Sequence, residues 1–314
     1  MMAVGLDLVL WLLVLGIAGW VVGVRDTFAA VLGYIVYGLL LALVWMRLAS
    51  PDAALTEAAV GALAGVLLLR AGIRLRPTEA QDECVRPGLL LRVSVAVLCG
   101  VVVAGLAWAV IALPDPAPTL APEVLAHQGA TDLGNSVTAV LLAFRALDTL
   151  LEAVVLIFAL VAVWSLTPDK AWGGVPGPAR GAMAAQIGRP YFARLLPPVG
   201  MVVAIYMFWV GADLPGGKFQ AGALLAAMWL LATMAGLAPP PAISRRALRV
   251  WVIAGTLVFL AIGAAGVPTA GAFLAYPEAI AKPLILVIEA ASMVSIGVTL
   301  GLLVVGYPEQ GGEA

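Results

Sequence analysis

Residues 136–166 read SVTAVLLAFRALDTLLEAVVLIFALVAVWSL. Only three side chains in this stretch are ionisable, namely Arg145, Asp148 and Glu152. A helix needs about 20 predominantly apolar residues to cross the hydrocarbon core of a bilayer. The stretch is longer than that, so it predicts a spanning helix that is tilted or that extends beyond the membrane.

The composition of the whole chain extends this prediction. Of its 314 residues 63% are hydrophobic and 11% are charged, whereas a soluble domain carries about 25% charged residues. The chain is therefore predicted to be an all-α, polytopic integral membrane protein in the lipid bilayer. A net charge of −1 argues against a nucleic-acid partner. Cys84 and Cys99 lack the spacing of metal ligands, so neither a metal nor a cofactor is expected.

Nine segments are long and apolar enough to cross a bilayer, with the boundaries uncertain by several residues. The predicted spans are 4–23, 27–47, 52–73, 89–112, 136–166, 194–211, 219–238, 250–266 and 283–306.

Lys and Arg residues predict the orientation of these spans. With nine crossings, thirteen of them lie in connections on one side of the membrane, and only Arg47, Lys218 and Lys282 lie on the other. The positive-inside rule then places the N-terminus outside and the C-terminus in the cytoplasm. The Pro-rich 114–135 connection lies outside, and the Gly- and Pro-rich 167–193 connection separates five spans from four.

The three ionisable residues of the fifth span predict an ion or proton path. In a helix, Arg145, Asp148 and Glu152 share one face, since they are three and seven residues apart. Ionisable groups in membrane helices usually face a protein interface or a wet cavity. A carboxylate there could take up and release protons, with Arg145 lowering its pKa. The alternative is an ion pair that holds the helix to a neighbouring subunit, with the second acid solvated.

The third span carries two further acids. Asp52 lies at its start, where it can cap the helix and complement the helix dipole, which is preferred here over a role as carrier. Glu57 lies more than one turn inside, where capping does not explain it. Proton handling is favoured for Glu57, and a hydrogen bond to Thr56 or to another helix is the alternative.

The external connection between spans six and seven contains Pro215-Gly216-Gly217, which predicts a tight turn. Asp213 is expected to be part of this turn, with an ionic role as the second possibility. Lys218 opens span seven, although a lysine is disfavoured at a helix N-terminus. Lys218 is therefore either an interfacial lysine or part of the ion path.

Two titratable residues remain. Glu289 lies within span nine and has no residue of opposite charge within four positions, so it must be protonated or face a polar cavity. It is a candidate carrier. His127 lies in the external 114–135 connection, where it is expected to be solvated, with proton collection as the alternative.

Three motifs carry a resemblance to a known family. Residues 50–61, SPDAALTEAAVG, resemble the MbhD-like module of membrane-bound hydrogenases. Residues 135–152, NSVTAVLLAFRALDTLLE, resemble the MbhE-like pattern N-x-V-T-A-V-L-L-x-F-R-x-x-D-T-x-x-E. Residues 214–222, LPGGKFQAG, resemble the turn of the B-type antiporter subunit, with Lys218 where that pattern has a third glycine. The chain thus resembles a fusion of Mrp-type multisubunit cation/proton antiporter modules, which are related to the membrane arms of energy-converting hydrogenases and complex I.

The resemblance implies an MbhD-like module at 1–113, an MbhE-like module with its external loop at 114–175 and a four-helix module of the B type at 176–314. It implies that the chain is a subunit of a transport complex in the cell inner membrane and is not an enzyme. The implied partners are other membrane subunits and protons, with Na⁺ as the candidate second ion. The alternative is a structural scaffold that anchors a redox, hydrogenase-like or inorganic-carbon-uptake module to a pumping subunit. A freestanding transporter would need inverted repeats, which we do not find in the sequence.

Overall fold

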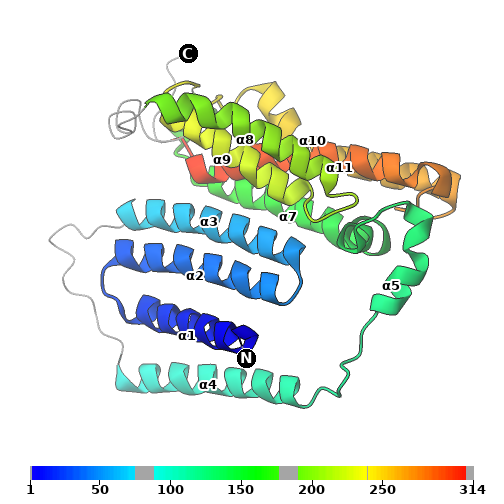
Figure 1. Ribbon diagram of the computed structural model, residues 1–314. Helices are drawn as coiled ribbons and strands as arrows, with labels where there is room; N and C mark the ends of the chain where they lie inside the picture. The colour runs from blue at the N-terminus through cyan, green and yellow to red at the C-terminus, as the bar shows by residue number, and fades with distance from the viewer. Residues whose placement is uncertain (1, 75–87, 177–189, 239, 309–314) are drawn as a thin grey trace.

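The computed structural model describes residues 2–74, 88–176, 190–238 and 240–308 (Figure 1). Every element of regular structure in these residues is a helix, which confirms the all-α class. The long helices are α1 (Met2–Gly23), α2 (Thr27–Arg47), α3 (Pro51–Arg74), α4 (Leu89–Ile111), α7 (Ala146–Ser165), α8 (Pro190–Val210), α9 (Lys218–Met234), α10 (Arg246–Ala270) and α11 (Ala281–Val305). The short ones are α5 (Ala121–His127), η2 (Gln128–Thr131), α6 (Ser136–Ala139), η3 (Val140–Phe144), η4 (Asp169–Ala171) and η5 (Glu278–Ile280).

Seven of the long helices are long and apolar enough to cross a membrane, and the chain is a polytopic membrane protein. The apolar parts of α8 and α9, Arg194–Val210 and Lys218–Met234, are shorter. The count of nine crossings and the orientation of the termini stay predictions. Cys84 and four of the basic residues that predict the orientation, Arg76, Arg86, Arg180 and Arg189, lie outside the described residues.

The predicted fifth span is not one continuous helix. After α6 the chain forms the π-helical turn η3, and the backbone breaks at Arg145, with φ −130° and ψ 35°, before α7 begins. The break is stabilised because side chains bind the carbonyls that it releases. Thr149 donates to the Leu141 carbonyl over 2.5 Å, and Tyr276 donates to the Leu142 carbonyl over 2.9 Å. Arg145 therefore lies at the N-terminal end of α7 and not within a straight helix.

The long helices lie side by side in two groups (Figure 1). Helices α1–α3 form one group and α7–α11 the other, with α4 beyond α1 and away from α7–α11. Small residues allow close approach, as is usual between membrane helices. A Cβ atom added to Gly38 of α2 would lie 3.3 Å from the Cα of Gly61 in α3.

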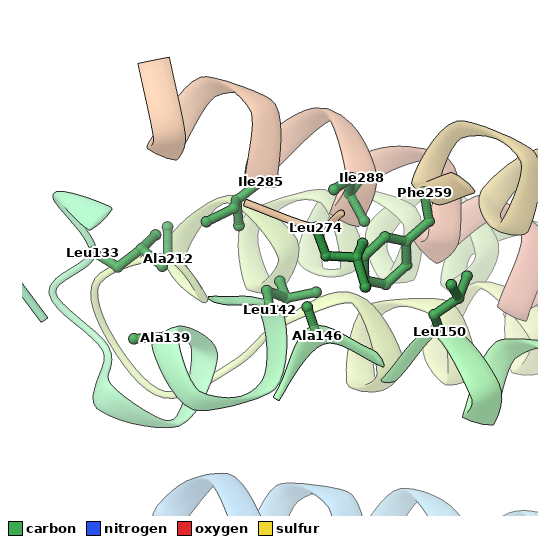
Figure 2. Packing of buried hydrophobic residues seen from close by; sticks show 10 residues of the cluster. All are labelled: Leu133, Ala139, Leu142, Ala146, Leu150, Ala212, Phe259, Leu274, Ile285 and Ile288. Atoms are coloured by element: carbon green, nitrogen blue, oxygen red, sulfur yellow. The ribbon is translucent and has the colours of Figure 1, made fainter. Parts of the chain in front are cut away.

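The main apolar core lies in the second group (Figure 2). Leu142, Ala146 and Leu150 come from η3 and α7, and they face Phe259 of α10 and Ile288 of α11. Helix α11 is the most buried of the candidate spans, whereas α4 buries no residue within this chain. The polar residues of α11 are therefore the ones that this chain encloses most fully.

Candidate functional site

A polar junction joins three parts of the sequence at one end of the bundle. It comprises Asp52 at the start of α3, Asn135 at the start of α6 and the turn 211–217 between α8 and α9. The Asn135 amide donates to Asp52 Oδ1 over 3.3 Å and to the Leu214 carbonyl over 3.0 Å. Asp52 Oδ1 also accepts from the backbone N–H of Gly216 over 3.0 Å. Because each bond crosses more than 70 residues of chain, the junction fixes the turn against both of the other segments.

The turn itself requires its glycines. Gly216 has a φ of 151°, in the left-handed region that favours glycine, and an added Cβ atom would lie 2.6 Å from the Met207 carbonyl oxygen. An added Cβ on Gly211 would lie 2.5 Å from the Gly217 nitrogen. This compact turn delivers the chain directly into α9 at Lys218.

Glu289 of α11 meets the start of α9. Its side chain is buried, with the residue only 2% exposed, and its carboxylate accepts a hydrogen bond from the backbone N–H of Lys218. A carboxylate is favourable at a helix N-terminus, because the first N–H groups and the helix dipole attract an anion. The Lys218 side chain is near enough for its ammonium to act electrostatically on the Glu289 carboxylate, although no ion pair within 4.0 Å joins the two among the described residues. Lys218 and Glu289 are called the buried pair below. The other oxygen, Oε2, has no hydrogen-bond partner among the described residues.

Neighbouring side chains enclose this pair. The Lys218 ammonium lies 5.3 Å from the centre of the Phe259 ring, a cation–π distance at the edge of the apolar core. Gln220 of α9 donates to the Thr56 hydroxyl of α3 over 2.8 Å, and Thr56 donates to the Asp52 carbonyl over 2.9 Å. Polar contacts thus run from α3 through the turn to the buried pair.

The three charges of the MbhE-like motif lie elsewhere. Arg145 and Asp148 form an ion pair of 2.5 Å, and their side chains are 71% and 55% exposed. Glu152, one turn further along α7, is exposed as well. The set lies on the surface of this chain, because the break at Arg145 and the packing of Thr149 and Leu150 turn the opposite face of α7 inward. Whether these three residues form an ion path or contact a neighbouring subunit stays a prediction. Glu152 is near enough to act electrostatically on the Lys218 ammonium, although no hydrogen bond or ion pair joins the two side chains among the described residues.

The two acids of α3, Asp52 and Glu57, have different surroundings. Asp52 lies in the first turn of α3, where an acid complements the helix dipole, and its Oδ1 also accepts from Asn135 and Gly216. The preference for a capping role over a carrier role stays a prediction. Glu57 is half-buried on α3, and its Oε1 lies 4.0 Å from the position of a Cβ added to Gly38 of α2. It therefore faces the crossing of α2 and α3.

Two other predicted residues lie outside the spans. Asp213 accepts from Lys282 over 2.8 and 3.0 Å and from the Gly134 N–H over 3.0 Å. The Lys282 ammonium holds the pKa of Asp213 below its ordinary value, with Gly134 adding to the effect. His127 is exposed on α5, and its Nδ1 lies 2.9 Å from the Glu123 carbonyl oxygen.

Sequence reasoning missed several members of this site. Gln220 was not identified, Thr56 was considered only as a partner of Glu57, and the proximity of Glu289 to Lys218 was not foreseen across 71 residues. Tyr276 was also missed; burial raises its pKa to about 12, so its hydroxyl stays a donor to the Leu142 carbonyl. The available signal was a polar residue in an otherwise apolar helix, which identifies Gln220 but not what it contacts.

Comparison with known protein families agrees with the three motifs. Residues 12–78 match the MbhD family and residues 90–169 match the MbhE family, both of which are subunits of MBH. Residues 190–307 match the family described as "Domain related to MnhB subunit of Na+/H+ antiporter". No curated protein matches the chain.

Two solved structures share the fold. One is the Mrp complex from Dietzia sp. DQ12-45-1b, with a TM-score of 0.69 and 23% identity. The match covers 98% of the present chain but only 35% of the matched chain of that complex. The other is the membrane-bound sulfane sulfur reductase, an archaeal respiratory membrane complex, with a TM-score of 0.56 and 24% identity. This match covers 69% of the present chain and 97% of the matched chain. The three family matches follow one another along the sequence, so the chain is a fusion of MbhD, MbhE and MnhB-related modules, and its fold is similar to that of a chain of the Mrp complex.

Proposed function

We propose that this chain provides a proton path within a cation/proton antiporter of the inner membrane, and that Lys218 and Glu289 are its central groups. One observation carries the proposal: Glu289 is 2% exposed beside Lys218, and its Oε2 has no hydrogen-bond partner among the described residues. A buried ionisable group inside a membrane helix is expensive, and such groups typically serve transport. An oxygen without a partner is free to bind a proton.

The electrostatic contacts suggest an order along the path. Glu152 lies on the surface of α7 and attracts Lys218, which in turn lies beside Glu289. Protons would pass from the Asp148 and Glu152 surface to the buried pair, with Arg145 paired to Asp148. Glu57 would extend the path toward α2. Asp213 and His127 would remain at its entrance without carrying the transfer.

The family matches suggest which ion is exchanged for protons and how the chain divides into modules. The MnhB family takes its description from a Na⁺/H⁺ antiporter, so we take Na⁺ as the exchanged cation. We also keep the division into modules at 1–113, 114–175 and 176–314, whose last two meet at the Asn135 contacts with the turn. Other membrane subunits would complete the path.

The test uses the intact complex reconstituted in vesicles. Glu289→Gln removes the titratable oxygen but keeps the shape of the side chain, so we expect coupled proton and Na⁺ flux to be lost while the complex still assembles on a native gel. Glu278→Gln, which alters an exposed glutamate before α11, should leave flux unchanged. Normal flux in Glu289→Gln would contradict the proposal.

A structural scaffold is the second candidate. The exposed ion pair of Arg145 and Asp148 is an observation that favours it, because such a pair can bind a neighbouring subunit. The likeness to the sulfane sulfur reductase complex adds that a related fold occurs in a respiratory complex. On this reading Asp148→Asn and Glu152→Gln abolish assembly, whereas on the first reading they reduce flux in a complex that assembles normally.

A further inference from the structure

A small cavity lies one helical turn beyond Glu289, between α7, α10 and α11, and most of its lining is apolar. Four of its lining residues carry hydroxyl groups: Thr256, Ser292, Ser295 and Thr299. Its volume of ≈ 10 Å³ is room for about one water molecule. A water molecule of this size would find its polar partners at the hydroxyl groups and not along the rest of the lining.

Two of these hydroxyls lack a hydrogen-bond partner. Thr256 and Ser292 are only 7% and 2% exposed, and neither Thr256 Oγ1 nor Ser292 Oγ has a partner among the described residues. The other two hydroxyls are satisfied: Ser295 donates to the Val252 carbonyl over 2.5 Å, and Thr299 donates to the Ser295 carbonyl over 2.7 Å. Buried polar groups in folded proteins nearly always have a partner, either protein or water. The hydroxyl groups of Thr256 and Ser292 are therefore the two groups of the cavity that need a hydrogen-bond partner from outside the described residues.

Gly255 sets the separation of the two helices at this point. A Cβ atom added there would lie 2.7 Å from the Cα of Ser292 and 3.0 Å from the Cβ of Ser295. Because α10 and α11 approach so closely at Gly255, the hydroxyl of the next residue, Thr256, is brought to the same cavity as Ser292. The close approach excludes larger ligands and leaves space for a single small one.

We propose that Thr256 and Ser292 bind one internal water molecule, and that this water continues the proton path from Glu289 along α11. The inference rests on the proposed role of Glu289 and extends it beyond the buried pair. Glu289, Ser292 and Thr299 lie on one side of α11, since they are three and ten residues apart. At about 1.5 Å per residue this track covers ~15 Å, or about half the hydrocarbon thickness.

The transfer conserves protons and charge at every hydroxyl. The Ser292 oxygen accepts a proton from the Glu289 side and releases its own proton to the bound water, and the water passes a proton on in the same way. Each group ends the step neutral, so no charge remains in the apolar surroundings. A water without hydroxyl partners could not be held in register for this exchange.

The water itself is tested by a high-resolution cryo-electron microscopy map of the intact complex. We expect a density peak within about 2.6–3.2 Å of both Thr256 Oγ1 and Ser292 Oγ. The peak should persist when Na⁺ in the buffer is replaced by K⁺. An empty cavity, or a peak that requires Na⁺, would overturn the inference.

The role of the water is tested by proton flux in vesicles that contain the intact complex. Thr256→Val removes the hydroxyl at nearly constant volume, and we expect flux to fall several-fold, whereas Thr256→Ser should retain it. The matched control is Thr269→Val on the same helix, where an exposed hydroxyl binds its own Ala265 carbonyl over 2.6 Å. Equal flux in Thr256→Val and the wild type, with assembly normal in both, would overturn the inference.

The two proposals can fail separately. If Glu289→Gln abolishes flux while Thr256→Val does not alter it, the proposed function stands and the water path fails. If the water peak is present but Glu289→Gln transports normally, the site binds water and the proposed function fails.

Discussion

Two sets of charges in this chain have opposite surroundings. Arg145, Asp148 and Glu152 form the most conspicuous charged cluster in any apolar run, yet Arg145 and Asp148 are more than half exposed on α7. Lys218 and Glu289 come from helices that are far apart in the sequence but in contact in the structure, and Glu289 is almost fully enclosed. The number of charges in a span is therefore a poor guide to burial. The energetic consequences follow burial, because an enclosed charge has lost its water and depends on its partner.

The largest expected effect comes from removing one member of the enclosed pair. Lys218→Leu leaves Glu289 without its cation and should lower the stability of the assembled complex by about 3–5 kcal/mol. Arg145→Leu, which breaks the exposed pair, should cost at most about 1 kcal/mol within this chain. Thermal unfolding of the purified complex measures both.

A double variant sharpens this prediction. Lys218→Leu combined with Glu289→Leu removes both charges and should recover much of the lost stability, since a buried pair replaced by apolar residues is often neutral. Equal losses for Lys218→Leu and Arg145→Leu would show that the two sets do not differ in the way their burial indicates.

The next effect concerns the turn that positions the pair. Gly216→Ala places a Cβ atom 2.6 Å from the Met207 carbonyl oxygen and forces a side chain into a φ of 151°. We expect a loss of about 1–3 kcal/mol, with flux reduced because Lys218 shifts. Gly271→Ala is the matched control, since Gly271 also has a positive φ but no atom within 4 Å of an added Cβ. If both variants behave alike in unfolding and in flux, the turn does not position Lys218.

A smaller effect concerns the helix break that places Arg145, Asp148 and Glu152 on the surface of the chain. Thr149→Val leaves the Leu141 carbonyl at the π-helical break without its donor, and we expect a cost of about 1–2 kcal/mol in chemical unfolding. Thr233→Val, which alters a half-buried hydroxyl bound within its own helix, should change little. An unchanged Thr149→Val would mean that the break at Arg145 does not depend on this bond.

The smallest effect is a pH dependence at the surface. The pKa of Asp213 is lowered by Lys282, so the pair stabilises the fold above the ordinary aspartate pKa of 3.8 and ceases to do so as pH falls through the lowered value. Because the Asp213 side chain is 53% exposed, the effect should be only about 0.5 kcal/mol or less. Unfolding of the wild type and Asp213→Asn should differ at neutral pH and converge in acid; a difference that grows as pH falls would contradict this.

The spans were largely predictable because hydropathy depends on local composition. The predicted spans 27–47 and 89–112 correspond to α2 and α4 within one residue at each end. The fifth span is not the continuous helix that was predicted, and one of the carbonyls released at its break, that of Leu142, binds Tyr276, a residue more than 130 positions away. No local pattern reports that contact.

The candidate site was predictable only residue by residue. Glu289 and Lys218 were identified because each is disfavoured where it lies in an apolar segment. Their pairing, and the tethering of Asp52 by Asn135, could not be read from either segment alone. The hydroxyls of Thr256 and Ser292 gave no signal at all, since single Thr and Ser residues are common in membrane helices.

By itself, the sequence determined that this chain is a helical membrane protein built from recognisable modules, because the cost of placing polar groups in hydrocarbon acts on every segment separately. Only the tertiary structure decided which charges are enclosed and which are exposed. That outcome depends on which face of each helix packs against its neighbours, and close contacts such as Gly255 against Ser292 set it. Burial is a property of the assembled bundle, whereas hydrophobicity is a property of each segment.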